Sequence, residues 1–352
     1  MLRWAIPEFR LPGEVVEREI DLLRRLGVVF NCNLTLGRDK SLQELKSAFG
    51  AVILALGCPE AVELNIEGRD LEGVHHGLPL LKAVRSGQRP DLGQRVVVIS
   101  GGNVAVDAAQ TALRLGAGRV SLVCLEAADE LPAFPWSVES ALSEGVQLKA
   151  SLGPVRFRGR EGKVAGVELK ACLSVFDESG SFAPCFDDGQ VQALEADAVI
   201  VAVGQKTGGA VSGQGEADEL PLQTSDPQVF VAGDCLTGPS TVVEALAQGR
   251  RAAESVDRFL RKEHLRYNRA YPGPVETEFE IEAGPDSAGP RVALPTRVWQ
   301  GAGDFQELES ALDRAAAFPA VSLSASSRPA GSVCPARSNA PTKPFGLTYH
   351  IC

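Results

Sequence analysis

The chain has 352 residues, a formal net charge of −10 and 44% apolar residues, which is enough for two domains of ordinary size with a large core. The acidic balance disfavours a nucleic-acid partner, because phosphates require a basic face. No apolar run approaches the ~20 residues of a membrane span, and the opening residues do not resemble a signal peptide, so we expect a cytoplasmic protein. The cysteines and histidines lack metal-ligand spacing, so we expect no metal site.

The N-terminal part of the chain predicts one helix and two short strands. Residues 13–26 place apolar side chains on one helical face and end before Gly27, which is typical of a helix. Residues 28–30 and 51–56 are apolar runs that predict strands. Residues 58–95 are a mixed connection rich in glycine and charge.

The most informative stretch lies near residue 100. Residues 96–99 predict a buried parallel strand, a glycine turn follows at once, and a helical pattern then runs to Leu115. Residues 119–125 predict a second strand, and Glu126 stands at its end. This order is typical of a nucleotide-binding unit, in which the turn brings backbone N–H groups to a pyrophosphate and the acid accepts hydrogen bonds from an adenosine ribose.

The turn departs from the usual pattern at its first position, where Ser100 replaces a glycine and must tolerate a tight turn. The alternatives are a glycine turn of any parallel α/β protein and, for Glu126, a solvated acidic turn. We nevertheless expect Glu126 to bind the ribose. The residues expected to line the dinucleotide pyrophosphate are Ser100, Gly101, Gly102, Asn103, Val104 and Ala105.

The middle of the chain interrupts the parallel pattern and then returns to it. Residues 135–144 predict a helix, and residues 155–171 predict an antiparallel hairpin. Residues 198–203 are again a fully apolar strand that runs into glycine. We expect that glycine, Gly204, to contact the nicotinamide half of the dinucleotide.

A second strand-to-helix unit follows. Residues 229–232 predict a buried strand that ends at Gly233 and Asp234, and a long helix is predicted from 241 to about 262. A strand, an acid and a helix start in this order suit a ligand site, because a helix N-terminus offers unpaired N–H groups. The alternative for Asp234 is a turn-forming aspartate.

The C-terminal part has a different composition. From about residue 268 it is rich in Pro, Gly, Ala and Ser, with one possible short helix at 305–317. Residues 318–352 show no periodicity, and we expect them to lack stable structure.

Four strings of residues together resemble one family. They are Met1–Pro12, Gly101–Ala109, Val231–Asp234 and Gly238–Ala245. The chain is similar over residues 1 to about 262 to FAD-dependent pyridine-nucleotide oxidoreductases of the glutamate synthase small-subunit type. The same module occurs in dihydropyrimidine dehydrogenase and in NAD(P)H-oxidising subunits of larger iron–sulfur complexes.

The resemblance implies an α/β fold of two nested Rossmann-like nucleotide-binding domains with an antiparallel β excursion. The NAD-binding domain, residues 91–205, would be inserted in an incomplete FAD-binding domain formed by residues 1–90 and 206–262. Residues 263–352 would be a poorly ordered C-terminal tail.

The resemblance also implies hydride transfer from a nicotinamide to FAD, and then electron transfer to an iron–sulfur protein or a large catalytic subunit. The cofactors carry this chemistry, so no catalytic acid or base is expected. Gly233 and Asp234 would hold the ribityl chain of the flavin. Thr241 and Val242 would present N–H groups to its pyrimidine oxygen, where reduction builds negative charge.

Three features depart from the family pattern. The FAD fingerprint of the family, which lies upstream of the Met-Leu-Arg segment, is absent here, so we expect a chain that begins inside the family sequence and binds FAD poorly. NADPH-preferring members carry arginines where Leu125 and Glu126 stand, so we expect NADH rather than NADPH. No cysteine-rich iron–sulfur segment is visible, and the sequence after about residue 313 looks unrelated to the family.

Two other classes stay open at the level of sequence. The chain can be a non-catalytic nucleotide-binding subunit or a truncated, inactive remnant, and the content of bound flavin would distinguish these from an enzyme. A Rossmann dehydrogenase acting on an organic substrate is a weaker hypothesis, because it would need a catalytic Lys, Tyr or His near the nicotinamide.

Overall fold

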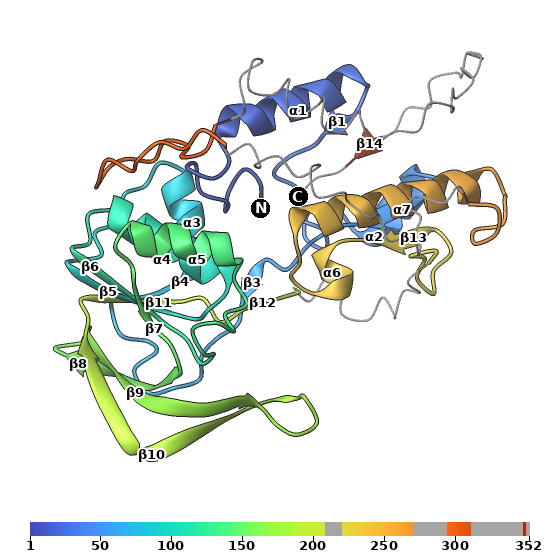
Figure 1. Cartoon of the computed structure of the whole chain (residues 1–352). Helices are drawn as coiled ribbons and strands as arrows, with labels where there is room; N and C mark the ends of the chain where they lie inside the picture. The colour runs from blue at the N-terminus through green and yellow to red at the C-terminus, as the bar shows by residue number, and fades with distance from the viewer. Residues whose placement is uncertain (208–219, 270–293, 311–347, 350–352) are drawn as a thin grey trace, which may run out of the picture.

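The computed structural model describes residues 1–207, 220–269, 294–310 and 348–349, and its elements fall into two α/β parts (Figure 1). Among these residues no helix is long and apolar enough to cross a membrane. The expected α/β fold with parallel sheets is confirmed.

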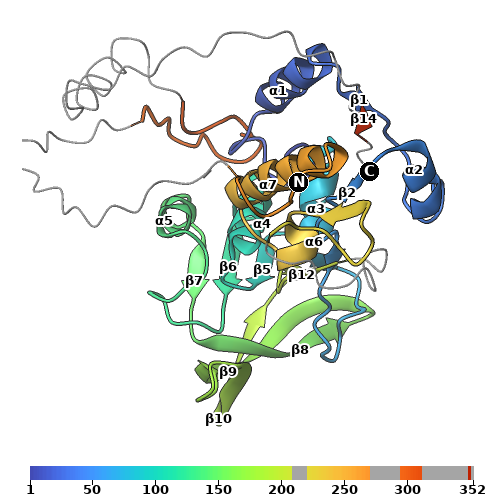
Figure 2. The same cartoon turned by 90° about the vertical axis from the view of Figure 1, so that its right-hand side faces the viewer.

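The larger part is built on a five-stranded parallel sheet in the order β4-β11-β5-β6-β7. Helices α3, α4 and α5 cover one face of this sheet, and strands β8–β10 cover the other (Figures 1 and 2). The bounds are Val74–His76 for β4, Ala198–Val201 for β11, Arg95–Ile99 for β5, Arg119–Val123 for β6, Gln147–Lys149 for β7, Gly77–Arg85 for α3, Asn103–Arg114 for α4 and Pro135–Ser143 for α5.

Alternation along the central strands supplies two separate cores. Val96 and Val98 of β5 point to the helical face and pack with α4, whereas Val97 and Ile99 point to the other face. This is the period of two expected of a strand that is buried on both sides. The sheet is therefore largely apolar on both faces.

The second face is covered by an antiparallel sheet in the order β10-β9-β8. Its strands are Leu152–Arg160, Lys163–Phe176 and Phe182–Glu195 for β8, β9 and β10. The hairpin predicted at 155–171 is β8 and β9, which bury Phe157, Val167 and Leu169 against the parallel sheet. The third strand was not predicted.

The smaller part pairs β2, Val52–Leu54, with β13, Val229–Val231, in parallel. The long helix α7, Val242–Leu260, packs on this pair through Ala252. Helices α2, Leu42–Ala48, and α6, Asp234–Thr237, complete it. The chain passes twice between the two parts, and the two passages pair as β3, Glu60–Ala61, and β12, Gln205–Lys206.

An N-terminal helix, α1 at Gly13–Arg25, precedes β1, Val29–Phe30, which pairs with β14, Thr348–Tyr349. The helices predicted at 13–26, 135–144 and 241–262 are therefore confirmed as α1, α5 and α7.

The structure also differs from the sequence reading. The connection at 58–95 contains β4 and α3, and β4 pairs with β11, so the five-stranded sheet includes a strand that the division at residue 91 assigned to the flavin domain. The domain boundaries themselves stay a prediction. Residues 305–310 are not helical, and the remainder of the helix predicted at 305–317 lies outside the described residues. Apart from 348–349, so do residues 318–352, which were expected to lack stable structure.

Candidate functional site

The glycine turn lies at the carboxyl end of β5, as predicted. Ser100 adopts a φ of 140°, a conformation that favours glycine, and its N–H donates to the carbonyl of Val123 at 2.9 Å. Its hydroxyl accepts the N–H of Gly102 at 3.3 Å, which ties the turn together. Serine thus replaces the first glycine of the pattern without opening the turn.

The second position of the turn has little space for a side chain. A Cβ atom on Gly101 would lie 3.0 Å from Oε2 of Glu126 and 3.2 Å from side-chain atoms of Cys124 and Pro132. The same contact shows that the half-buried carboxylate of Glu126 lies over the turn. The structure therefore brings together two predicted site residues that are 25 positions apart.

Helix α4 starts directly from this turn. Its N-cap, Gly102, makes no side-chain capping bond, and the N–H of Ala105 donates to the carbonyl of Gly102 at 3.0 Å. Among the described residues, the N–H groups of Asn103 and Val104 therefore remain without a partner at the start of the helix. Asn103 uses its side chain elsewhere, because Oδ1 accepts the N–H of Phe134 at 3.1 Å. A helix N-terminus with free N–H groups at this edge can hold an anion such as a pyrophosphate.

A small hollow lies beside the start of α4, at the carboxyl ends of β4 and β11. It measures about 30 Å³ and is lined by Gly77, Val104, Ala202 and Gly204 among others. Gly204 has a φ of 129°, and its carbonyl accepts the N–H of Val62 at 3.0 Å. Two more predicted residues, Val104 and Gly204, therefore share one hollow at the same edge of the sheet.

The second predicted unit lies in the smaller part. Gly233 has a φ of 78° and donates its N–H to Oε1 of Gln248 at 2.7 Å. Asp234 begins α6, is half-buried, and accepts the hydroxyl of Ser240 on Oδ1 at 2.8 Å. That hydrogen bond leaves the second carboxylate oxygen available to a ligand hydroxyl.

The start of α7 is closed by a capping box. Thr241 accepts the N–H of Glu244 on its hydroxyl, and its own N–H donates to the Glu244 carboxylate at 2.8 Å. Because that N–H has an internal partner, Val242 is the first residue of α7 that can offer an N–H to a ligand. Val242, Val243 and Leu246 leave 37%, 75% and 68% of their surface exposed beside it.

Comparison with known proteins identifies the family. Residues 16–249 match the family described as pyridine nucleotide-disulphide oxidoreductase. The chain belongs to this family. The resemblance to the glutamate synthase small-subunit group is confirmed, because curated relatives of this oxidoreductase carry that name.

Two relatives show the extent of the similarity. This oxidoreductase is 34% identical over 275 residues to the NADP(+)-dependent formate dehydrogenase subunit beta of Moorella thermoacetica. It is 31% identical over 287 residues to the glutamate synthase [NADPH] small chain of Escherichia coli. Each match covers 74% of this chain, but only 39% and 61% of the respective relative.

The fold is also shared with a solved structure, Mycobacterium tuberculosis FprA in complex with NADPH. The TM-score is 0.62 over 74% of this chain and 75% of that one. At 17% identity, this likeness concerns the fold alone.

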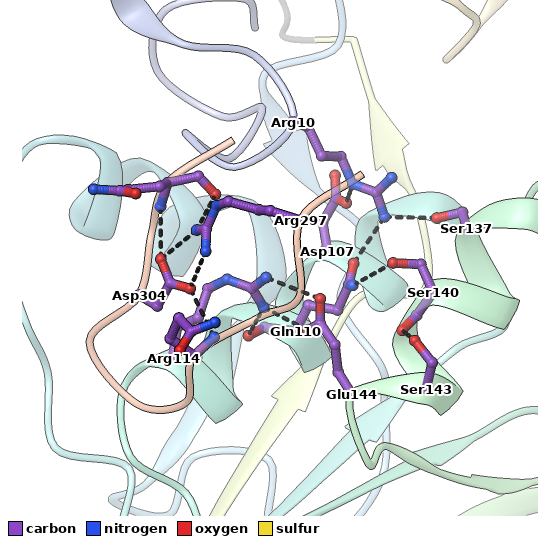
Figure 3. A network of polar contacts seen from close by, with 12 residues as sticks. Arg10, Asp107, Gln110, Arg114, Ser137, Ser140, Ser143, Glu144, Arg297 and Asp304 are labelled. Atoms are coloured by element: carbon purple, nitrogen blue, oxygen red, sulfur yellow. Dashed lines mark hydrogen bonds and ion pairs between the residues drawn. The ribbon is translucent and has the colours of Figure 1, made fainter. Parts of the chain in front are cut away.

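The family member also contains a buried polar network that sequence reasoning missed (Figure 3). The guanidinium of Arg10 forms an ion pair with Asp107 of α4 and donates to Gln110 at 2.9 Å and to Ser137 of α5 at 2.6 Å. Burial raises the pKa of Asp107 to about 6, although the Arg10 charge acts to lower it. Both residues lie inside the strings that carry the family resemblance, but nothing in their spacing of 97 positions links them.

The network continues into a fully buried ion pair. Arg114, with a side chain that is 0% exposed, donates to both carboxylate oxygens of Glu144 at 2.6 and 2.9 Å. Its guanidinium lies 3.8 Å from the centre of the Phe9 ring. The carbonyl of Arg114 accepts the N–H of Gly303 at 2.8 Å, so α4 anchors both the N-terminal segment and the segment at 294–310.

Proposed function

We propose that this chain is an NAD(P)H-oxidising flavin module that moves a hydride from NADH to FAD and passes electrons to an iron–sulfur protein or a large subunit. One observation carries the proposal. The free start of α4, the carboxylate of Glu126 and the hollow at Gly204 converge at one edge of the parallel sheet. Family membership and the names of relatives, which are subunits, support it.

The dinucleotide would lie across that edge. The free N–H groups of Asn103 and Val104 would bind the pyrophosphate, which the turn at Ser100–Gly102 and Ala105 would line. Val104 and Gly204 would contact the nicotinamide half. The hollow of about 30 Å³ has the volume of roughly one water molecule. The nicotinamide ring would therefore lie over this hollow, whose lining also includes Ala61 and Gln205 of the β3–β12 pair.

The residues of the smaller part fit a flavin. Asp234 has a carboxylate oxygen for a ribityl hydroxyl, Gly233 allows close approach, and Val242 is the first free N–H of α7. The exposed apolar side chains of Val243 and Leu246 give a surface that a flat ring can cover. When bound, FAD would accept a hydride and release electrons singly, and the protein would position it.

The preference for NADH rests on Glu126. Its carboxylate lies over Gly101, where it can accept hydrogen bonds from both ribose hydroxyls of NADH but would repel the 2′-phosphate of NADPH. Relatives are named for NADP(+) or NADPH, so this feature would set the chain apart from them. The backbone of Lys149, on β7, pairs with that of Val123, on the neighbouring strand β6. If the preference were reversed, Lys149 would be the cation that binds the 2′-phosphate.

Calorimetric titration of the 352-residue chain with NADH and NADPH tests the preference. We expect tighter binding of NADH, and we expect Glu126→Arg to shift the preference toward NADPH. Glu130→Arg is the matched control, because it makes the same charge change at an exposed site on the same loop. Tighter NADPH binding by the unmodified chain, especially if Lys149→Met weakens it, would contradict the proposal.

Hydride transfer to the flavin is tested separately. With excess FAD and no oxygen, addition of NADH should bleach the flavin absorbance. A chain that binds NADH but retains no FAD would instead be a non-catalytic nucleotide-binding subunit.

A further inference from the structure

A larger hollow, of about 240 Å³, lies at the other end of the same helices. Because α3 and α4 follow parallel strands, they start at the nucleotide-binding edge and run back from it. The hollow lies between Arg85, at the end of α3, and Thr111, which is eight residues or about 12 Å along α4 from Asn103. It is therefore separate from the proposed coenzyme site.

The hydroxyl of Thr111 is the first sign of a ligand. Thr111 is 1% exposed, it lines the hollow, and its oxygen has no hydrogen-bond partner among the residues that the structure describes. A buried hydroxyl without a partner is unfavourable, so a polar ligand group that reached it would bind with a real gain.

Two arginines, Arg85 and Arg89, give the lining of the hollow a net positive charge. Arg85 is 5% exposed and held rigidly, because it pairs with Glu8 and donates to the carbonyls of Leu11 and Arg3 at 2.8 and 3.2 Å. Its charge is therefore already balanced by Glu8. The second cation, Arg89, is the one that remains for an anion.

Arg89 is positioned but not neutralised. Its guanidinium lies 4.4 Å from the centre of the Phe305 ring and donates to the carbonyls of Val84 and Gln88. No carboxylate of the described residues forms an ion pair with it. A guanidinium stacked on a ring and tied by one nitrogen can still offer its other N–H groups to a carboxylate.

The remaining walls are apolar, from Pro7, Leu81, Val84 and Phe305. At about 30 Å³ for each water, the hollow holds about eight waters, or a molecule of roughly ten non-hydrogen atoms. We infer that this hollow is a binding site for a small organic carboxylate, with Arg89 on the carboxylate, Thr111 on a polar atom and the apolar walls around the body of the molecule.

Such a ligand would contact the N-terminal segment as well as α3 and α4. The hollow is closed on one side by Pro7 and Glu8, which belong to the same N-terminal segment as Arg10, the partner of Asp107 on α4. Occupancy would fix that segment against α3 and α4, far from the reacting edge. The inference does not depend on the proposed oxidoreductase activity and can be tested without a nucleotide.

Benzoate, with nine non-hydrogen atoms, and its uncharged isostere benzamide are suitable probes. Calorimetry or chemical-shift titration of the whole chain should give saturable benzoate binding and at least tenfold weaker benzamide binding. Arg89→Gln should weaken benzoate at least tenfold, whereas Arg160→Gln, a matched change at an exposed site on β8, should not.

Two further variants separate a ligand site from a structural role. Glu8→Gln should tighten benzoate binding, because it removes the one negative charge of the hollow and keeps an oxygen for the N–H of Gly13. Thr111→Val should weaken binding of a ligand with a second polar atom, such as 4-hydroxybenzoate, without lowering the melting temperature. Failure of benzoate to bind up to about 10 mM, equal binding of benzamide, or no effect of Arg89→Gln would overturn the inference.

Discussion

The buried pair Arg114–Glu144 is the contact on which the largest effect of a single substitution is expected. The two side chains are 0% and 4% exposed, so water cannot compensate either charge. Glu144→Gln keeps the shape of the side chain and removes its charge, which leaves the buried Arg114 guanidinium without a paired carboxylate, next to the Gln110 carbonyl and the Phe9 and Trp299 rings.

The size of the effect follows from this burial. Removal of one partner of a buried ion pair costs about 3–5 kcal/mol, because an uncompensated charge stays in the interior. Replacement of both partners by apolar residues of similar volume is often neutral or stabilising. The double variant Arg114→Met/Glu144→Leu should therefore be more stable than Glu144→Gln. It also loses the contact of the cation with Phe9, which lowers its free energy of unfolding by about 2 kcal/mol.

Urea unfolding followed by tryptophan fluorescence measures these differences, because Trp299 lies 5.5 Å from the Arg114 guanidinium. An unchanged denaturant slope would show that the variants unfold from the same compact state. If Glu144→Gln lost less than about 1 kcal/mol, or if the double variant were the least stable of the set, the pair could not be the buried charge contact described.

Three further outcomes are expected. Because burial raises the pKa of Asp107 to about 6, the folded chain holds this proton more tightly than the unfolded chain, and the contribution of Asp107 to stability falls as the pH rises from about 4 to about 6. Asp107→Asn should abolish that dependence, a difference of about 1 kcal/mol between pH 5.5 and pH 7.5 in urea unfolding. Gly68→Ala should lower the free energy of unfolding by more than about 2 kcal/mol, because its Cβ would lie 2.2 Å from the Phe157 carbonyl oxygen. Gly27→Ala has nothing within 4 Å of its Cβ, so it should lose only the roughly 1–2 kcal/mol that a positive φ costs a residue with a side chain. Thermal unfolding of the two variants measures this difference. Asp234→Ala should weaken FAD roughly 10- to 100-fold in a fluorescence titration, and unchanged affinity would remove Asp234 from the flavin site.

The local sequence was sufficient to predict the helices and strands in which apolar residues recur at a regular spacing or form a continuous run. The helical stripe of α1 and α7 and the apolar runs of β5, β6 and β11 are visible in the sequence because each is decided by neighbours within a few residues. The glycine turn, its serine and the acid beyond the second strand could be predicted for the same reason. The structure then placed Glu126 over Gly101.

Elements without such a period were missed. Strand β4 has three residues, and β10 is mostly exposed and contains the polar run Asp187–Gln190, so neither shows a clear apolar alternation. Helix α3 has an apolar stripe, but it is short and follows a glycine-rich connection. Strand β4 forms because it pairs with β11, which is more than a hundred residues away, and β10 forms because it pairs with β9.

The family and the parallel α/β class can be read from the sequence, as can the position of the glycine turn. That Arg10 meets Asp107, that Arg114 and Glu144 are buried together, and that Arg89 and Thr111 line one hollow is visible only in the folded chain. A charged side chain has the same appearance in a sequence whether it is solvated or paired. Its partner is fixed by the packing of elements far apart in the chain, and that information is not local.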